Sequence, residues 1–215
     1  MLIVEFHCHT NASGDSLVRP ADLVKTCRDR GIDRVIITDH NSIRGALEAQ
    51  RIAPDMVIVG EEVMTTVGEL LCAFVQEEVP AGLTPSEVIA RLKDQGAFIS
   101  VSHPFDQMRA PWFSNGLDEI VADIDAIEIF NARCLLPSYN RDATTYARDH
   151  GLAGTAGSDA HMLTELGKAT TLLPEFEDAD GLRRVISKAQ YETRRTGLLA
   201  RLGSRYAAFR KGSAK

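Results

Sequence analysis

Short groups that contain histidine, aspartate or glutamate recur along this sequence, and each follows a run of apolar residues. The groups are His7-Cys8-His9-Thr10, Thr38-Asp39-His40, Gly60-Glu61-Glu62, Ser102-His103-Pro104 and Ser158-Asp159-Ala160-His161. Five of the six histidines belong to these groups, and only His150 falls inside an expected helix. A single histidine of this kind could simply cap a turn, but five in equivalent positions indicate a shared site.

Imidazole and carboxylate groups together form the kind of ligand set that zinc, manganese and iron accept in proteins. Two neighbouring ions need a bridging carboxylate, terminal imidazoles and open positions for water and a substrate oxygen, and Glu62 is a suitable bridge. Such ions lower the pKa of bound water, so a metal-bound hydroxide can attack a phosphoryl group without a serine or cysteine nucleophile. Ser102 and Ser158 stand outside any GxSxG pattern, which also argues against a nucleophilic serine.

Apolar runs alternate with amphipathic segments along the chain, and this alternation predicts strands and helices. We expect strands at 2–6, 35–38, 56–59, 70–75, 97–101, 126–130 and 152–155, and helices at 20–30, 42–52, 84–95, 138–150 and 180–188. Uniformly apolar strands separated by helices predict a parallel sheet, and six or seven such units favour a closed or nearly closed barrel of the TIM type. Active sites of such barrels lie at the C-terminal ends of the strands, where the polar groups stand.

The composition fits one large globular domain of 215 residues, 44% of them hydrophobic. A formal net charge of −6 argues against a protein that coats nucleic acid or an anionic membrane. The chain begins without a basic leader and has no long apolar run, so we expect a cytoplasmic protein with no membrane partner. Four widely spaced cysteines, Cys8, Cys27, Cys72 and Cys134, fit buried reduced thiols better than disulfides.

The segment after Glu192 differs in charge from the rest of the chain. It carries seven basic residues and no acidic one (Arg194, Arg195, Arg201, Arg205, Arg210, Lys211 and Lys215), whereas the preceding part has 17 basic against 30 acidic residues, a net charge of −13. We therefore divide the chain into a barrel at 1–192 and a basic tail at 193–215, and expect the tail to form a helix packed on the barrel. Contact between this tail and nucleic acid is the less favoured alternative.

Taken together and in order, the polar groups resemble the motifs of the PHP (polymerase and histidinol phosphatase) superfamily. With Asp15, they span residues 5–167, about three quarters of the chain. The resemblance implies an α/β fold, specifically a distorted (β/α)7 barrel, that holds two or three divalent metal ions (Zn, Mn or Fe) and acts as a metal-dependent phosphoesterase.

The resemblance also implies which residues hold each ion. One ion is expected on His7, His9, Glu62 and Asp159; a second shares Glu62 and takes His103; a third takes Asp15, His40 and His161. Asp159, His161 and His103 are expected to be the catalytic residues. For the phosphate group we expect Arg109, Arg133 and Asn131, since guanidinium groups suit phosphate oxygens.

Three positions depart from the family pattern. Glu5 stands where the family often has an aspartate, and we expect it to support the ligands rather than bind an ion. Glu61 lies beside Glu62. Because side chains alternate between the two faces of a strand, only one of them points inward, and we expect this to be Glu62. The segment Gly68-Glu69-Leu70-Leu71 lacks the histidine that usually completes the second position, so either Glu69 replaces it or that ion is held weakly.

We therefore expect hydrolysis of a phosphoester in a small phosphorylated metabolite or nucleotide. Two alternatives stay open. One is a catalytically weak metal-binding regulatory module, and the other is an exonuclease that acts on short single strands and binds them through the basic tail.

Overall fold

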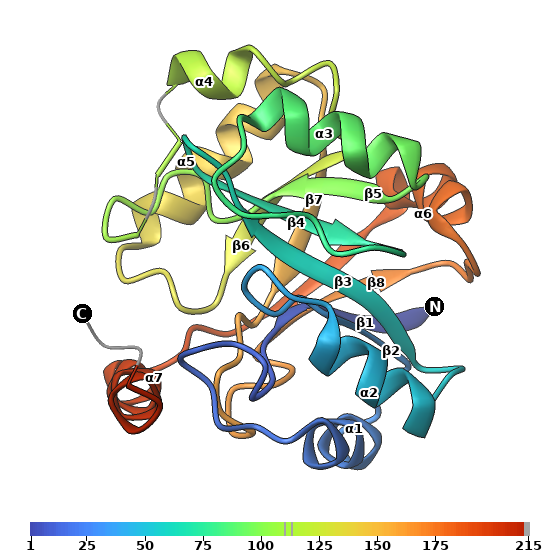
Figure 1. Cartoon of the computed structure of the whole chain (residues 1–215). Helices are drawn as coiled ribbons and strands as arrows, with labels where there is room; N and C mark the ends of the chain where they lie inside the picture. Colours follow the sequence, from blue (N-terminus) through green and yellow to red (C-terminus); the bar gives the residue numbers. More distant parts are fainter. Residues whose placement is uncertain (110, 113, 213–215) are drawn as a thin grey trace.

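A single curved sheet forms the centre of the computed structural model, which describes residues 1–109, 111–112 and 114–212 (Figure 1). Its strands are β1 (Leu2–Cys8), β2 (Arg34–Ile37), β3 (Val57–Met64), β4 (Glu69–Ala73), β5 (Phe98–Val101), β6 (Ala126–Asn131), β7 (Ala153–Gly157), β8 (Ala169–Leu173) and β9 (Gln190–Thr193). The order across the sheet is β7-β6-β5-β4-β3-β2-β1-β8-β9. The backbone N–H of His9 donates to the carbonyl oxygen of Ala160 (2.8 Å), and Cys8 pairs with Ala160 in a parallel bridge. These contacts join β1 to the segment after β7 and nearly close the sheet into a barrel.

Helices surround this sheet. They are α1 (Pro20–Asp29), α2 (Arg44–Ile52), α3 (Pro85–Asp94), α4 (Ser114–Asp118), α5 (Pro137–Asp149), α6 (Ala179–Val185), which a 3-10 turn at Ile186–Lys188 extends, and α7 (Leu198–Arg210). A capping box begins α3: the Thr84 hydroxyl accepts from the Glu87 N–H, and the Glu87 carboxylate accepts from the Thr84 N–H. Figure 1 shows α1 and α2 beside the first strands and α3 and α5 beside the later ones. The predicted α/β fold and nearly closed barrel are therefore confirmed.

The expectation of a wholly parallel sheet is wrong at β4 and β8. β4 runs antiparallel to both β3 and β5, and β8 runs antiparallel to both β1 and β9. Only residues 65–68 separate β3 from β4, and so short a connection can join only antiparallel neighbours. The sequence analysis also missed β8 and β9. Two threonines interrupt the apolar run of β8, and every residue of β9 is exposed, so neither strand has the apolar pattern of a buried one.

Two apolar clusters make up most of the core. One lies between the sheet and its outer helices and includes Leu23, Ile37, Leu92 and Ile99. The other brings together residues from strands all around the sheet, so it fills the barrel; its members include Val4, Phe6, Ile36, Ile58, Phe98 and Leu173, together with Leu182 of α6. Close packing of the apolar strand residues thus holds in place the strands that carry the polar groups at their ends.

The basic C-terminal segment contains α7, which touches the barrel near the end of β1. The ammonium group of Lys211 donates to the carbonyl oxygens of Asn11 and Ser13 (2.6 Å each). A side chain at Gly203 would collide with Met162, so the helix lies close to the loop after β7. The division of the chain at residue 192 remains a prediction, and residues 213–215 of the tail lie outside the described residues.

The four cysteines are buried and unpaired. None of the helices in the described residues combines the length and the apolar character needed to span a bilayer.

Candidate metal centre

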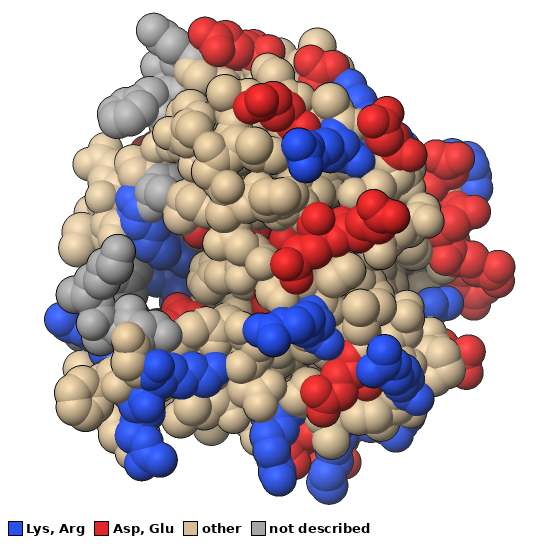
Figure 2. Space-filling view, viewed as in Figure 1, with Lys and Arg blue, Asp and Glu red and all other residues tan. Residues whose placement is uncertain are grey.

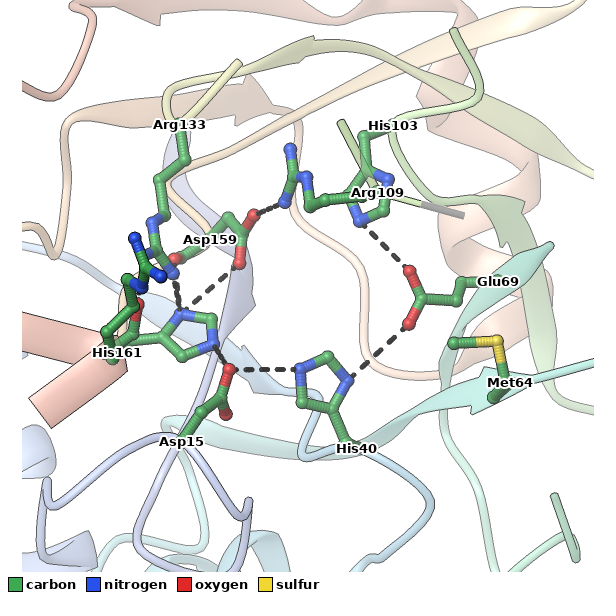
Figure 3. Close-up of a pocket in the computed structure, with 11 residues that line it drawn as sticks. Asp15, His40, Met64, Glu69, His103, Arg109, Arg133, Asp159 and His161 are labelled. Atoms are coloured by element: carbon green, nitrogen blue, oxygen red, sulfur yellow. Dashed lines mark hydrogen bonds and ion pairs between the residues drawn. The ribbon is translucent and has the colours of Figure 1, made fainter. Parts of the chain in front are cut away.

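The strand ends bring all eight predicted metal-binding residues together at one end of the barrel. His7 comes from β1, Glu62 from β3, and the others from the segments that follow β1, β2, β5 and β7 (His9, Asp15, His40, His103, Asp159 and His161). Figure 3 shows several of these side chains pointing toward one another around a common space. Most are almost fully buried, whereas Asp15 and His40 are about one third exposed. Two of them, His103 (φ 22°) and Asp159 (φ 53°), adopt positive φ angles, which the surrounding structure must hold in place.

Four donor atoms form the most compact group. The Nε2 atoms of His7 and His9 lie 3.1 Å apart, and each lies 3.3–3.6 Å from Glu62 Oε2 and from Asp159 Oδ1. Ligands about 2.1 Å from a tetrahedral ion are separated from one another by about 3.4 Å. These five distances are those expected between ligands of one four-coordinate ion, and His7, His9 and Asp159 offer ligand atoms that all lie within 4.8 Å of one another.

The bonding of Glu62 supports a cation at this place. Its Oε1 accepts a hydrogen bond from the Ser102 hydroxyl (2.6 Å), whereas its buried Oε2 lies 3.0 Å from His40 Nδ1 and 3.3 Å from His7 Nε2. Buried carboxylate oxygens are costly unless hydrogen bonds or positive charge compensate them. The donors present fit a divalent ion, which would supply that charge.

A second group surrounds the other oxygen of Glu62. His103 Nε2 lies 3.4 Å from Glu62 Oε1 and 3.3 Å from Glu69 Oε2, and His40 Nδ1 lies 3.8 Å from Glu69 Oε1. The carboxylate of Glu69 therefore spans the space between two imidazoles (Figure 3). His40, Glu62 and Glu69 also offer ligand atoms that all lie within 4.8 Å of one another.

The third group consists of Asp15, His40 and His161. Asp15 Oδ2 lies 2.9 Å from His161 Nε2 and 3.7 Å from His40 Nε2. His9, His40 and His161 offer a further set of nitrogens within 4.8 Å. The three predicted groups thus adjoin one another, with Glu62 common to the first two.

The charges of these candidate ligands are set by burial and by one another. Burial lowers the pKa of His9 to about 3, with help from nearby His161 and His40, so its imidazole is neutral and free to bind a metal. Burial opposes protonation of His7 and His40 as well, but neighbouring carboxylates, Glu62 foremost, raise the pKa of both well above the ordinary value. Burial would raise the pKa of Glu62, yet the surrounding imidazoles lower it well below its usual range.

Glu128 supports the first group and was missed by the sequence analysis. His7 Nδ1 lies 2.9 Å from Glu128 Oε1, so Nε2 is left to face the other ligands. Glu128 Oε2 accepts from the His103 N–H (2.8 Å) and from Asn131 Nδ2 (3.0 Å). A glutamate between isoleucines in the apolar run of β6 was the available signal.

Asp39 organises the loop after β1. Its carboxylate accepts hydrogen bonds from the N–H and hydroxyl of Thr10 (2.6 Å each) and from the hydroxyl of Ser13 (2.8 Å). The same Ser13 hydroxyl lies 3.2 Å from His9 Nδ1. The Thr-Asp-His group thus contributes one residue to the centre, His40, and one that holds the His-x-His-Thr loop.

Glu5 and Glu61 both lie outside the ligand groups. Glu5 accepts from the backbone N–H groups of His7 (3.2 Å), Ser158 (2.9 Å) and Gly167 (2.9 Å), so it joins the backbones of three segments rather than orienting an imidazole. Glu61 points away from the centre and accepts from the Val79 N–H (3.0 Å).

The two arginines expected at the phosphate both reach the centre. Arg109 forms ion pairs with Asp159 and with Asp106, and Arg133 contacts His161 Nδ1 (2.5 Å) and Glu165 (3.3 Å). Asn131 is fully buried, and its Nδ2 donates to Asp159 Oδ2 (3.1 Å). Asn131 therefore lies behind Asp159, whereas the arginines reach the open space.

An open pocket of about 420 Å³ exposes this centre. Its walls carry Asp15, His40, Met64, Glu69, His103, Arg109, Arg133, Asp159, His161, Ser204 and Arg205. The last two belong to α7, so the C-terminal helix forms part of the wall, which the sequence analysis did not foresee. Figure 2 shows basic side chains around the hollow beside α7, whereas acidic side chains gather on the opposite side, near α3 and α6.

Two family models match this chain. The model described as PHP domain matches residues 5–97, and the model described as PHP-associated matches residues 137–191. The uncharacterized protein MJ1587 of Methanocaldococcus jannaschii is 34% identical over 151 residues, which cover 64% of this chain and 83% of that protein.

Three solved structures share the fold. PsfC from Pseudomonas syringae has a TM-score of 0.69 at 16% identity, with 99% of this chain and 98% of that chain covered. A Bifidobacterium adolescentis protein proposed to be a metal-dependent phosphoesterase has a TM-score of 0.63 at 20% identity, with 91% and 97% covered. The lesion-specific endonuclease EndoQ from Pyrococcus furiosus has a TM-score of 0.63 at 15% identity, and the match covers 87% of this chain and 56% of that one. At these identities the likeness concerns the fold alone.

Proposed function

Because this chain belongs to the PHP domain family, we propose that it is a metal-dependent phosphoesterase, a phosphoric ester hydrolase. The observation that carries the proposal is the meeting of His7, His9, Glu62 and Asp159, whose donor atoms have the spacing of ligands around one ion. The buried Glu62 Oε2, which the nitrogens of His7, His9 and His40 surround, supports a cation in the same place.

We assign the ligands to three adjoining groups, the first two of which share Glu62. His7, His9, Glu62 and Asp159 would hold the first ion, Glu62 and His103 the second, and Asp15, His40 and His161 the third. When bound, such ions provide an activated water and neutralise charge that develops on the phosphoryl oxygens. Asp159, His161 and His103 are the proposed catalytic residues; like Asp15 and His40, each is an assigned ligand that lines the pocket.

Three arginines from separate segments are placed to bind and orient a phosphoryl group. Arg109 follows β5, Arg133 follows β6, and Arg205 belongs to α7; all three line the pocket. Guanidinium groups bind phosphate oxygens through paired N–H donors. They supply local positive charge in a protein whose net charge is −6.

The pocket volume of about 420 Å³ suits a small phosphorylated metabolite or a nucleotide, which is the substrate class we propose. Asn131 would act as a positioning residue, because its amide lies between Arg109 and Asp159 and holds both.

One observation favours a second candidate, an exonuclease that acts on short single strands. The outer face of α7 exposes Tyr206 (56%) and Phe209 (74%) between Arg205 and Arg210, and this face continues from the pocket wall. Exposed aromatic rings among basic side chains can stack nucleic-acid bases while the cations contact phosphates.

A substrate panel tests the proposal. The purified full chain, loaded with Mn²⁺ or Zn²⁺, would be assayed on phosphomonoesters, phosphodiesters, nucleotides and short single strands, beside His9→Ala and Asp159→Ala. We expect cleavage by the wild type and loss of cleavage in both variants. If the folded, metal-loaded wild type cleaves none of these esters, the proposal fails and a metal-binding regulatory module becomes the better account.

The same panel separates the two substrate classes. Replacing both Tyr206 and Phe209 by alanine should leave cleavage of bis(p-nitrophenyl) phosphate unchanged in either case. An increase of KM of about tenfold or more for a ten-nucleotide strand would support the exonuclease, since stacking contributes about 1–3 kcal/mol per base. An unchanged KM for the strand would support the small substrate.

A further inference from the structure

Asp106, in the loop after β5, is a fully buried acid to which the sequence analysis gave no role. Its two carboxylate oxygens have different partners. Oδ1 accepts from the backbone N–H of Met108 (3.0 Å), which shapes a tight turn. Oδ2 accepts from Nε (3.0 Å) and lies 2.9 Å from Nη2 of Arg109. One side chain therefore shapes the loop and also holds the guanidinium group that the loop carries.

The Arg109 guanidinium is held along one edge and points its remaining nitrogen into the pocket. Nε and Nη2 form the held edge, and Nη2 also donates to Asn131 Oδ1 (3.2 Å). Nη1 faces Asp159, a candidate ligand that lines the pocket (Figure 3). Asp106 thus lies behind the guanidinium, and the candidate centre lies in front of it.

This arrangement differs from that of an ordinary surface arginine. Arg148 is 73% exposed and pairs with its chain neighbour Asp149, which is 54% exposed. The Arg109 side chain is 24% exposed, and the side chain of Asp106 is 0% exposed. A long side chain loses rotamer freedom when it is ordered. If a buried carboxylate orders it before the substrate arrives, that loss no longer weakens the binding step.

We propose that Asp106 is a positioning residue, which holds the Arg109 guanidinium toward the centre so that it binds the phosphoryl group in a preset orientation. The inference rests on the proposed function and on the assignment of Arg109 to the phosphate. It adds that the pair Asp106 and Arg109, rather than the arginine alone, forms this part of the site.

Charge and orientation predict opposite effects when Asp106 loses its charge. The negative carboxylate lies beside Arg109 and offsets part of the attraction between the guanidinium and an anionic phosphate. If charge dominated, removal of the carboxylate would tighten phosphate binding. If orientation dominates, as we propose, its removal weakens phosphate binding. The sign of the change therefore separates the two effects.

Asp106→Asn removes the grip on Arg109 with little change to the loop. Asparagine has one acceptor oxygen, and it forms the same turn with an N–H two residues further on. With that oxygen on Met108, the amide NH₂ faces the guanidinium, and two donors cannot bond. Asp106→Ser is a second variant, because its hydroxyl can also accept from Met108 but is too short to hold Arg109.

Asp125→Asn is the matched control. Asp125 also accepts from a backbone N–H, that of Ile99 (2.9 Å), and from an arginine, Arg183 Nε (2.9 Å). It directly precedes β6 and so lies at the end of that strand away from the centre. The control therefore loses the same kind of contact at a place where phosphate is not expected to bind.

The test measures binding of inorganic phosphate to the full chain loaded with Mn²⁺ and freed of excess metal, by titration calorimetry. Elemental analysis and thermal melting would establish equal metal content and folding. We expect Asp106→Asn and Asp106→Ser to bind phosphate about 3- to 10-fold more weakly, with Asp125→Asn unchanged. In an Arg109→Ala background, Asp106→Asn should have no further effect, because it acts through the arginine.

Tighter or unchanged phosphate binding in both Asp106 variants would overturn the proposal. So would a loss of the same size in the Arg109→Ala background, or a wild type that binds no phosphate. If Asp106→Asn does not fold, Asp106→Ser decides the matter. The proposed function fails separately: the expected phosphate results without cleavage of any ester would uphold the role of Asp106 and reject the phosphoesterase. Cleavage together with equal losses in both backgrounds would reject the role of Asp106 alone.

Discussion

The Nδ1 atom of His7 lies 2.9 Å from a carboxylate oxygen of Glu128, and both side chains are excluded from solvent. This contact fixes the imidazole so that its other nitrogen faces His9, Glu62 and Asp159. The second Glu128 oxygen holds the backbone of His103, so one buried glutamate orients ligands from β1 and from the loop after β5.

We predict that Glu128→Gln weakens metal binding while the protein still folds. A glutamine amide can accept from His7 or from the His103 N–H, but it cannot accept from both. Loss of such a supporting contact typically lowers metal affinity about 10- to 100-fold. Competition with a coloured chelator would measure the change, and unaltered affinity would show that Glu128 does not orient the ligands.

Gly45, the second residue of α2, should not tolerate alanine. A Cβ atom there would lie 2.0 Å from the Thr10 hydroxyl and 2.3 Å from Asp39 Oδ2. It would therefore disrupt the buried hydrogen bonds that hold the loop after β1. Helix propensity alone predicts that alanine stabilises the helix by about 1 kcal/mol. We expect the opposite, a loss of about 1–3 kcal/mol in the free energy of unfolding.

Urea denaturation of Gly45→Ala would check this, with Gly197→Ala as the control because, apart from its chain neighbours, no atom of the described residues lies within 4 Å of the Cβ position there. Equal stability of the two variants would contradict the close packing of Gly45 against Thr10 and Asp39.

Arg109→Ala should impair substrate binding without loss of metal. Arg109 forms an ion pair with Asp159 in the structure. An ion bound at Asp159 would compete with this pairing, so the guanidinium group of Arg109 would be available to bind a phosphate. Hydrogen bonds to charged groups are worth about 1.5–3 kcal/mol, so we expect KM to rise about 10- to 100-fold. Steady-state kinetics and elemental analysis would test this, with the exposed Arg148→Ala as control. Loss of metal without a change in KM would contradict the assignment.

Metal binding should release protons and strengthen as the pH rises. Burial disfavours the protonated forms of His7 and His40, but nearby carboxylates raise the pKa of both well above 6.5. The metal-free protein therefore carries protons there near pH 7, and their stabilising effect, full below about pH 6.5, is lost as the pH rises through the raised pKa values. A metal must displace these protons. Titration calorimetry of metal binding in buffers of different ionisation enthalpy would detect the release, and equal heats in all buffers would contradict it.

The sequence revealed most of the candidate centre because its histidines and acids directly follow apolar strands, and strand ends must meet in a barrel. It did not reveal Glu128, whose role depends on β6 lying beside β7 and behind His7. The antiparallel direction of β4 brings Glu69 to the centre from the start of a strand rather than its end, which a parallel pattern does not anticipate. Arg205 reaches the pocket only because α7 folds back over the loop after β1, and no local pattern encodes that path.

The central claim is that the cluster around Glu62 holds the ions on which phosphoester hydrolysis depends. The most direct test is the hydrolysis rate of the chelator-stripped protein as metal is added back, for wild type, Glu62→Gln and Glu61→Gln. We predict no hydrolysis without metal, recovery in the wild type and in Glu61→Gln, and a rate at least about 100-fold lower in Glu62→Gln. A Glu62→Gln variant that recovers the wild-type rate, or a stripped protein that hydrolyses the ester without metal, would contradict the claim.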